Sequence, residues 1–227
     1  MNKKDIEEFA YQQLIKSNIK KLPINIYKII KNSHAATVVY SYDYIAIGAK
    51  VHGFSYDKLL ETFGHACIFY SEETQVYHIG VDTRCDFTTY NEALCHEIAH
   101  VIFSHVPITK PISIKNRDSI IEYQARTFAE CFLAPDPVLI DAQVNQPNEI
   151  SHTCHITLDT ATKKAKGLKY RSVFELLYAE SLNEIKGLLR IQFSDFISRY
   201  LSKKNRTDMS PELFPYNELA EMKKRIS

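Results

Sequence analysis

A chain of 227 residues with 45% hydrophobic and 24% charged residues has ordinary globular composition, and it is long enough to bury a substantial core. Its formal net charge of +1 gives the chain as a whole no electrostatic preference for nucleic acid, and no apolar run reaches membrane-spanning length. The polar start MNKKDIEEF is unlike a signal peptide, and the five cysteines form no CxxC pair. We therefore expect a cytoplasmic protein with reduced thiols and no membrane partner.

The N-terminal part of the chain is expected to supply two helices and a small sheet. Apolar residues recur at helical spacing over 4–18, and a second short helix is expected over 25–31. Residues 37–47, TVVYSYDYIAI, are rich in β-branched and aromatic side chains and are typical of a strand. The β-prone segments 66–70 and 75–82 flank the short polar link SEET, which predicts a hairpin.

A helix is expected next, over a segment that contains ALCHEIAHVIFSH at 93–105. Thr89 and Glu92 fit a capping box, in which both side chains satisfy free amides at the start of a helix. An apolar stripe at helical spacing follows, made up of Leu94, Ile98, Val101 and Ile102. Pro107 ends this helix and begins a loop to about residue 117.

The rest of the chain is predicted to be mostly helical. The helix expected over 118–135 has an apolar stripe of Ile121, Ala125, Phe128, Ala129 and Phe132. Residues 153–168 and 171–201 also follow helical patterns. Residues 202–218 are polar and look like a linker or tail, and a last short helix is expected over 217–225.

Three residues of the histidine-containing segment have the form H-E-x-x-H. His96 and His100 lie one helical turn apart on one face, so both imidazoles can bind a single Zn²⁺. Glu97 projects about 100° round the helix from His96, where it can take a proton from a water that zinc has acidified. A chance match to the three letters requires neither an amphipathic helix nor a further ligand downstream, and the sequence offers both. The spacing predicts His96 and His100 as metal ligands and Glu97 as the catalytic base.

A hydrolytic zinc site needs a third protein ligand and an open position for water. Glu122 is the first choice, because it lies near the start of the next helix and beside small residues. Ser119 and Glu122 also fit a capping box, in which the glutamate would bond only to the backbone. Asp118 is another candidate ligand, although it fits an N-cap better. His105 is expected to point away from the histidine pair on a straight helix and to have a structural or outer role, and His78 is a weaker candidate.

The stretches TTYNEALCHEIAHVIFSH and IEYQARTFAECFLAP resemble the ImmA/IrrE family of metallopeptidases. Members typically have HExxH, often a further histidine five residues on, then a helix of the form E-x-x-A-N/D-x-F-A and a Leu-x-Pro end. Here that helix has Glu122, Ala125, Phe128 and Ala129, followed by Leu133-Ala-Pro135. Residues 154–168 resemble the small C-terminal helical unit of the family, and the likeness covers about 75–170. It implies a gluzincin-type site in which Glu122 is the third zinc ligand.

These patterns together predict an α+β fold: a zincin-like catalytic domain with an HExxH helix, a small β-sheet and a helical C-terminal portion. The expected organisation is a metallopeptidase domain over 1–150, a helical unit packed on it over 151–201, and a polar tail over 202–227.

One position departs from the family pattern. Arg126 stands where members have Asn or Asp, four residues after the ligand glutamate. In related zincins an acidic residue there holds a zinc-binding histidine by its other ring nitrogen, and arginine cannot accept that hydrogen bond. Either another acceptor serves, such as a backbone carbonyl, Asp118 or Glu92, or the site is weakened and the chain is a pseudo-enzyme that keeps zinc.

Other side chains near the motif have weaker claims. Cys95 is expected to pack in the interior, and Cys85 is a less favoured candidate for an inhibitory thiolate on zinc. Tyr90, Tyr123 and His78 are candidates for stabilising the oxyanion of peptide hydrolysis.

The resemblance implies a cytoplasmic zinc endopeptidase that cleaves a helix-turn-helix transcriptional repressor and so derepresses genes of a mobile element or a stress response. One alternative is a non-catalytic metal-binding regulator that acts by binding a repressor, which Arg126 favours. A second is a DNA-binding protein that uses the basic residues of 154–171, for which a solvated helix face is the preferred interpretation.

Overall fold

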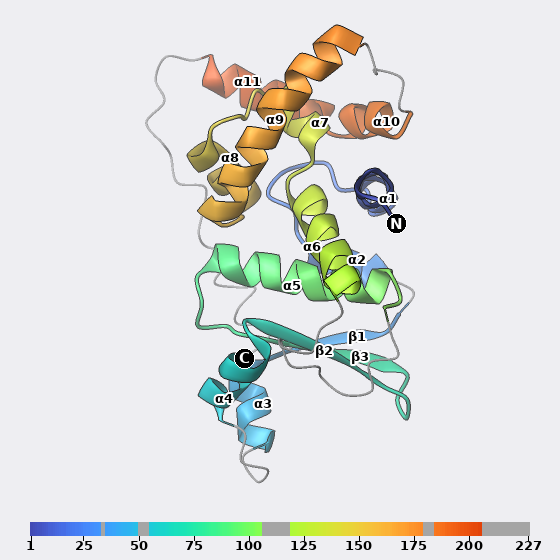
Figure 1. Ribbon diagram of the computed structural model, residues 1–227, viewed down its shortest axis with the longest axis vertical. Coiled ribbons are helices and arrows are strands. Elements are labelled where there is room, and N and C mark those ends of the chain that lie inside the picture. Colours follow the sequence, from blue (N-terminus) through green and yellow to red (C-terminus); the bar gives the residue numbers. More distant parts are fainter. Residues whose placement is uncertain (33–34, 50–54, 106–118, 179–183, 206–227) are drawn as a thin grey trace. The chain divides into compact units, whose positions relative to one another are not determined.

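The computed structural model describes residues 1–32, 35–49, 55–105, 119–178 and 184–205 (Figure 1). The described chain divides into two compact units. Among the described residues, the sheet unit comprises Ile26–Arg126, and the helical unit comprises Met1–Asn25 together with residues 127–205. Helices combine with one small sheet, which confirms the predicted α+β class. The units differ in extent from the predicted domains 1–150 and 151–201, which stay predictions.

The sheet has three strands, β1 (Thr37–Ser41), β2 (Ala66–Ser71) and β3 (Val76–Val81), in the order β1-β3-β2. Strands β2 and β3 are antiparallel, with Ala66 opposite Val81, so the predicted hairpin is confirmed. Strand β1 pairs with β3 in parallel. Helix α5 (Phe87–Ile102) packs against β2 and β3, and α3 (Tyr42–Ala49) and α4 (Tyr56–Phe63) pack on the other side (Figure 1).

The strand predicted over 37–47 is wrong in its second half. The hydroxyl of Ser41 accepts a hydrogen bond from the amide of Tyr44 at 3.1 Å, which turns the chain into α3 directly after β1. Tyr42 is then fully buried against the sheet. Gly80 of β3 allows this close approach, because a Cβ there would lie 2.7 Å from Ile45 Cδ1 and 3.0 Å from Tyr42 Cε1. The local Ser41–Tyr44 hydrogen bond and the packing of Tyr42 beside Gly80 therefore end the strand at Ser41, although the β-propensity of the sequence continues beyond it.

Helix α5 begins at Phe87, and its N-cap is Asp86 rather than the predicted Thr89. The Asp86 carboxylate accepts hydrogen bonds from the amides of Thr88 and Thr89 at 3.0 and 3.1 Å. It also accepts from both threonine hydroxyls. The capping box predicted for Thr89 and Glu92 is wrong, because the helix starts earlier and Asp86 already binds the threonine hydroxyl. One carboxylate thus satisfies two of the free amides at this helix start.

Replacing Asp86 by alanine is expected to lower the free energy of unfolding by about 1 kcal/mol, the usual cost of losing an N-cap. The Thr88 and Thr89 side chains lower the pKa of Asp86 to about 2. Because the folded pKa lies below the ordinary value of about 3.9, this stabilisation is present above about pH 4 and is lost as the pH falls toward about 2. Urea unfolding at several pH values measures it. Asp86→Asn is the control, because asparagine still caps the helix but has no carboxylate to titrate. The free energy of unfolding of this variant should therefore lack the pH dependence that Asp86 contributes.

The helical unit contains α1 (Lys3–Lys16) and the C-terminal helices. These are α7 (Asp136–Asp141), α8 (Pro147–Cys154), α9 (Leu158–Tyr178), α10 (Glu184–Gln192) and α11 (Ser194–Lys204). The boundary between the units falls within α6 (Ser119–Leu133). Phe128 and Phe132 of α6 are fully buried, as predicted. The Gln192 side chain donates to the carbonyls of Leu14 and Ile19 at 2.9 and 2.6 Å, which joins α10 to the end of α1.

Most predicted helices are confirmed. The first two correspond to α1 and to α2 (Tyr27–Asn32), and the helix over 118–135 corresponds to α6. The predicted break near residue 170 is wrong, because α9 continues to Tyr178. The tail helix over 217–225 lies outside the described residues. Among the described helices, none is both long and apolar enough to cross a membrane.

Candidate metal centre

His96, His100 and Glu122 come together in the sheet unit. The two Nε2 atoms of the histidines, one turn apart on α5, are separated by 3.2 Å. Glu122 extends from the first turn of α6, where its Oε2 lies 3.0 Å from His96 Nε2 and its Oε1 lies 3.4 Å from His100 Nε2. The structure thus brings together the three residues that sequence and resemblance single out as metal ligands.

The spacing of these donor atoms fits a metal ion. Zinc bonds of about 2.0–2.1 Å in a tetrahedron require ligand atoms about 3.3–3.4 Å apart. The nitrogen–nitrogen separation is 3.2 Å, and the two nitrogens lie 3.0 and 3.4 Å from the two different oxygens of Glu122, all close to that edge length. The side chains are 17%, 3% and 18% exposed, so the group is shielded but reachable. Two imidazole nitrogens and a carboxylate form a donor set that suits zinc and leaves a fourth corner open.

Glu97 follows His96 on α5 and is only 2% exposed. A carboxylate is rarely buried to this degree in a helix without a chemical or structural reason. Its place one residue after a candidate ligand is the place that the HExxH pattern gives to a general base. The structure therefore keeps the glutamate of the motif inside the protein rather than on its surface.

His105 lies beside His100, contrary to the expectation that it points away. Helix α5 ends at Ile102, and Ser104 takes a left-handed conformation with φ 52°. The amide of His105 donates to the carbonyl of His100, and the amide of Ser104 donates to that of Val101, both at 3.0 Å. This pair of bonds is a Schellman motif, which reverses the chain at a helix end. The expected direction assumed a straight helix and is wrong because of this reversal, whereas the expected structural or outer role of His105 stays a prediction.

A chain of hydrogen bonds leads from α6 through His105 to His100. His105 Nε2 lies 2.8 Å from Gln124 Oε1, and His105 Nδ1 lies 3.1 Å from His100 Nδ1. The amide oxygen can only accept, so His105 donates from Nε2 and keeps a lone pair on Nδ1. His100 then donates from its own Nδ1, which leaves its Nε2 lone pair directed toward His96 and Glu122. Burial lowers the pKa of His105 and so favours the neutral ring that this arrangement requires.

His105 therefore offers a hydrogen-bond acceptor to one of the two candidate ligand histidines, which Arg126 cannot do. Arg126 is exposed, and Asp118, one of the acceptors considered above, lies outside the described residues. The acceptor for a ligand histidine comes instead from the turn after α5 and is fixed by Gln124 of α6. Gln124 was not among the predicted site residues, because only the reversal at Ser104 makes its side chain relevant.

The other candidates lie elsewhere or have different partners. Cys95 is fully buried and its thiol pKa is raised by desolvation, as expected of a packed side chain. The Tyr90 hydroxyl is 2.6 Å from that of Tyr27 and is almost inaccessible. His78 stacks on Phe69 across β2 and β3, with ring centroids 4.8 Å apart. A role for His78, Tyr90 or Tyr123 in stabilising an oxyanion remains a prediction.

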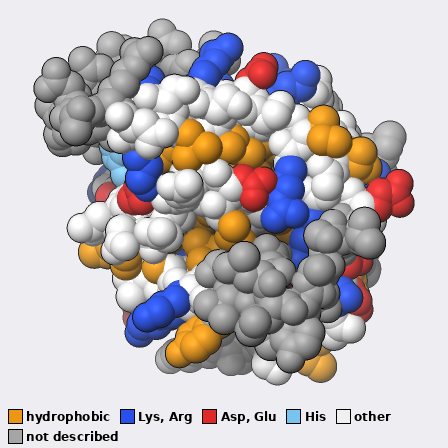
Figure 2. All heavy atoms as spheres, turned by 90° about the horizontal axis from the view of Figure 1, so that it is seen from above, with side chains coloured by type: hydrophobic (Ala, Val, Ile, Leu, Met, Phe, Trp, Pro, Cys, Tyr) orange, Lys and Arg blue, Asp and Glu red, His pale blue; other side chains and the backbone are white. Residues whose placement is uncertain are grey.

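The basic residues of 154–171 are partly balanced by carboxylates. Lys163 pairs with Asp159 at 2.5 Å, and Lys164 pairs with Asp136. On the face drawn in Figure 2, the described lysine and arginine side chains are interspersed with acidic, apolar and uncharged ones and form no continuous basic strip. Nothing in these described contacts favours a nucleic-acid site.

Two histidines one turn apart on a buried helix and a glutamate from the next helix form the donor arrangement that HExxH metallopeptidases use to hold a metal ion. The family model Peptidase_M78, described as the IrrE N-terminal-like domain, matches residues 49–163. This match spans half of the chain, and the chain belongs to that family. The resemblance to ImmA/IrrE metallopeptidases is thereby confirmed. No curated protein matches the chain.

Proposed function

We propose that this protein is a zinc-dependent endopeptidase that cleaves a helix-turn-helix repressor. The observation that carries the proposal is the group of two imidazole nitrogens and one carboxylate, separated by 3.0–3.4 Å, beside a buried glutamate of the HExxH motif. Membership of a metallopeptidase family supports the reaction type. Zinc as the metal is proposed from the donor set of two imidazoles and one carboxylate.

His96, His100 and Glu122 would hold the ion. Zinc bound there would supply a Lewis acid that acidifies water and polarises a peptide carbonyl. Glu97 accepts the proton of the attacking water and passes it to the nitrogen of the leaving amine. The peptide bond breaks, and a new carboxyl group and a new amine form. His105 and Gln124 are positioning residues, since they fix the tautomer that directs the His100 Nε2 lone pair into the centre.

The repressor substrate is proposed from the family resemblance. Incubating the purified chain with Zn²⁺ and helix-turn-helix repressors of the same genome should convert one repressor into two fragments, identified by mass spectrometry. A chelator should prevent cleavage, and readdition of Zn²⁺ should restore it. If every repressor stays intact while a generic peptide is hydrolysed, the peptidase activity stands and the proposed substrate is wrong.

A non-catalytic regulator is the remaining alternative of a different class. Arg126 favoured it because arginine cannot orient a ligand histidine, but His105 supplies that acceptor here. A regulator would release a repressor from its operator without fragments. A mobility-shift assay run beside the mass spectrum separates the two functions, because release with an intact repressor identifies binding alone.

A further inference from the structure

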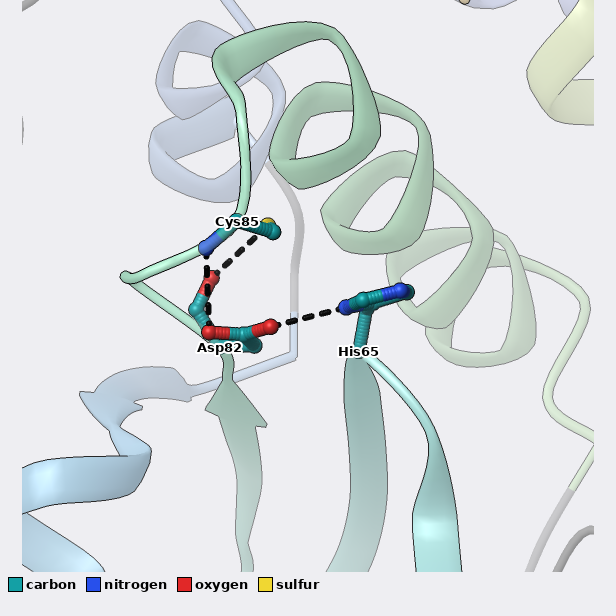
Figure 3. A group of neighbouring side chains, drawn as sticks. All are labelled: His65, Asp82 and Cys85. Atoms are coloured by element: carbon teal, nitrogen blue, oxygen red, sulfur yellow. Dashed lines mark hydrogen bonds and ion pairs between the residues drawn. The ribbon is translucent and has the colours of Figure 1, made fainter. Parts of the chain in front are cut away.

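A second group of side chains of the kinds that bind metal ions lies in the sheet unit, outside the HExxH motif. His65 directly precedes β2, Asp82 directly follows β3, and Cys85 lies three residues later (Figure 3). Each offers one ligand atom, and these atoms all lie within 4.8 Å of one another. The amide of Asp82 donates to the carbonyl of His65 at 2.8 Å, which continues the β2–β3 ladder and holds the two residues opposite each other.

The Asp82 carboxylate is buried and held in place by its own hydrogen bonds. Its Oδ1 accepts from the hydroxyl of Tyr56 and from the amides of Arg84 and Cys85, the last two at 2.8 and 3.2 Å. Its Oδ2 is 2.8 Å from His65 Nδ1. One oxygen is thus anchored by three donors, and the other is directed at the imidazole. Hydrogen bonds of this kind orient a carboxylate that binds a metal ion.

The same bonds fold the loop so that Cys85 turns back over Asp82. Its Sγ lies 3.1 Å from the Asp82 carbonyl, as Figure 3 shows, and the thiol is in no disulfide. His65 is 47% exposed and Asp82 only 4%, so the group opens to solvent on the imidazole side. The neighbouring charge of Arg84 is balanced by Asp43, whose Oδ1 lies 2.5 Å from the guanidinium. An arriving cation would therefore meet an accessible imidazole and thiol above a fixed carboxylate.

We infer that His65, Asp82 and Cys85 form a second metal site, for a transition-metal ion of borderline softness such as Zn²⁺. Imidazole nitrogen, carboxylate oxygen and thiolate sulfur are its three usual kinds of ligand. On binding, the His65 ring proton moves from Nδ1 to Nε2, and the Cys85 thiol proton passes to solvent. The ion replaces the hydrogen bond between His65 and Asp82 with bonds to both.

This site is separate from the HExxH centre. His96 lies nine residues after Phe87, the first residue of α5, which corresponds to about 14 Å along the helix. Paired catalytic metals lie about 3.5–4 Å apart, and this length of helix separates the loop of the second site from His96, so the two ions would not form such a pair. An ion at the second site would join the start of β2 to the loop before α5, the helix that carries His96 and His100. Its role would be to stabilise the scaffold of the catalytic helix.

Cobalt(II) is the probe that distinguishes the two sites. Thiolate coordination gives a charge-transfer absorption in the near ultraviolet, which nitrogen and oxygen ligands do not give, and the HExxH centre contains no cysteine ligand. Titration of the reduced, metal-free full chain should bind about two Co²⁺ with this band present. Cys85→Ser and His65→Ala should each remove the band and one equivalent. His96→Ala should remove the other equivalent and keep the band.

Cys154→Ala, which removes a buried thiol of the helical unit, is the control and should keep both equivalents and the band. A wild-type chain that binds one Co²⁺ without the band overturns the inference, as does a band that survives Cys85→Ser. Circular dichroism confirms that each variant is folded. Since the result depends on no peptidase assay, the second site and the proposed function fail or stand separately.

Discussion

Replacing Glu97 by glutamine is expected to lower peptide hydrolysis by about 10²–10⁴-fold, the usual contribution of a general base. Glutamine has nearly the same shape, so it fits the buried position that Glu97 occupies at 2% exposure. It cannot take a proton from water, and this is the step that the proposed mechanism assigns to the residue. The rate should be measured as kcat/KM on a cleaved repressor or on a generic peptide at saturating Zn²⁺.

Metal content is the second readout of this variant. Glu97 is not one of the three residues with donor atoms directed at a common point, so Glu97→Gln should retain about one metal ion in the HExxH centre. His96→Ala should lose both metal and hydrolysis. Glu130→Gln, a half-buried glutamate of α6 with no part in the proposed centre, is the matched control and should keep both. Wild-type hydrolysis by Glu97→Gln would mean that another residue is the base. If Glu97→Gln hydrolyses no peptide but relieves repression as well as the wild type does, the binding regulator is favoured.

The two candidate ligand histidines could be picked out from the sequence because their arrangement is local. Two histidines four residues apart on a helix share a face whatever the rest of the fold does. Glu122 is different, since it lies on a separate helix and its approach to His96 at 3.0 Å is a tertiary contact. The helical pattern after Pro107 placed Glu122 near a helix start, and the family resemblance gave it a role. Pattern alone left open a capping role for the same residue.

The features that sequence reasoning missed depend on single backbone turns. Ser104 takes a left-handed conformation in which glycine is the usual residue, so nothing in the sequence marks the reversal that brings His105 to His100. The N-cap of α5 was predicted at Thr89, and the hydrogen bonds that Asp86 accepts place it three residues earlier. The strand over 37–47 ends early because Ser41 caps the next helix. In each case the sequence pattern is compatible with more than one backbone conformation, and a specific hydrogen bond selects one of them.

Replacing His105 by alanine is expected to weaken Zn²⁺ binding by about 10–100-fold, the usual effect of losing a hydrogen-bond partner of a ligand histidine. Without the acceptor 3.1 Å from His100 Nδ1, the imidazole can place its proton on either nitrogen. The tautomer of His100 with its proton on Nε2 cannot bind the ion through Nε2. Molecules with this tautomer must move the proton to Nδ1 before they bind the ion, which lowers the affinity. Competition with a chelating dye of known affinity measures the change. His152→Ala, an exposed histidine of the helical unit, is the control and should leave the affinity unchanged.

The tautomer itself can be observed apart from affinity. Nitrogen NMR of the metal-free chain should show His100 protonated on Nδ1 in the wild type and on a mixture of nitrogens in His105→Ala. Gln124→Ala should produce a smaller shift in the same direction, because His105 then loses the acceptor 2.8 Å from its Nε2 that fixes its own tautomer. A folded His105→Ala variant with wild-type affinity and an unchanged His100 tautomer would contradict this role. His105 would then have no orienting role, and the absence of a carboxylate at position 126 would be expected to weaken the centre of the wild type as well.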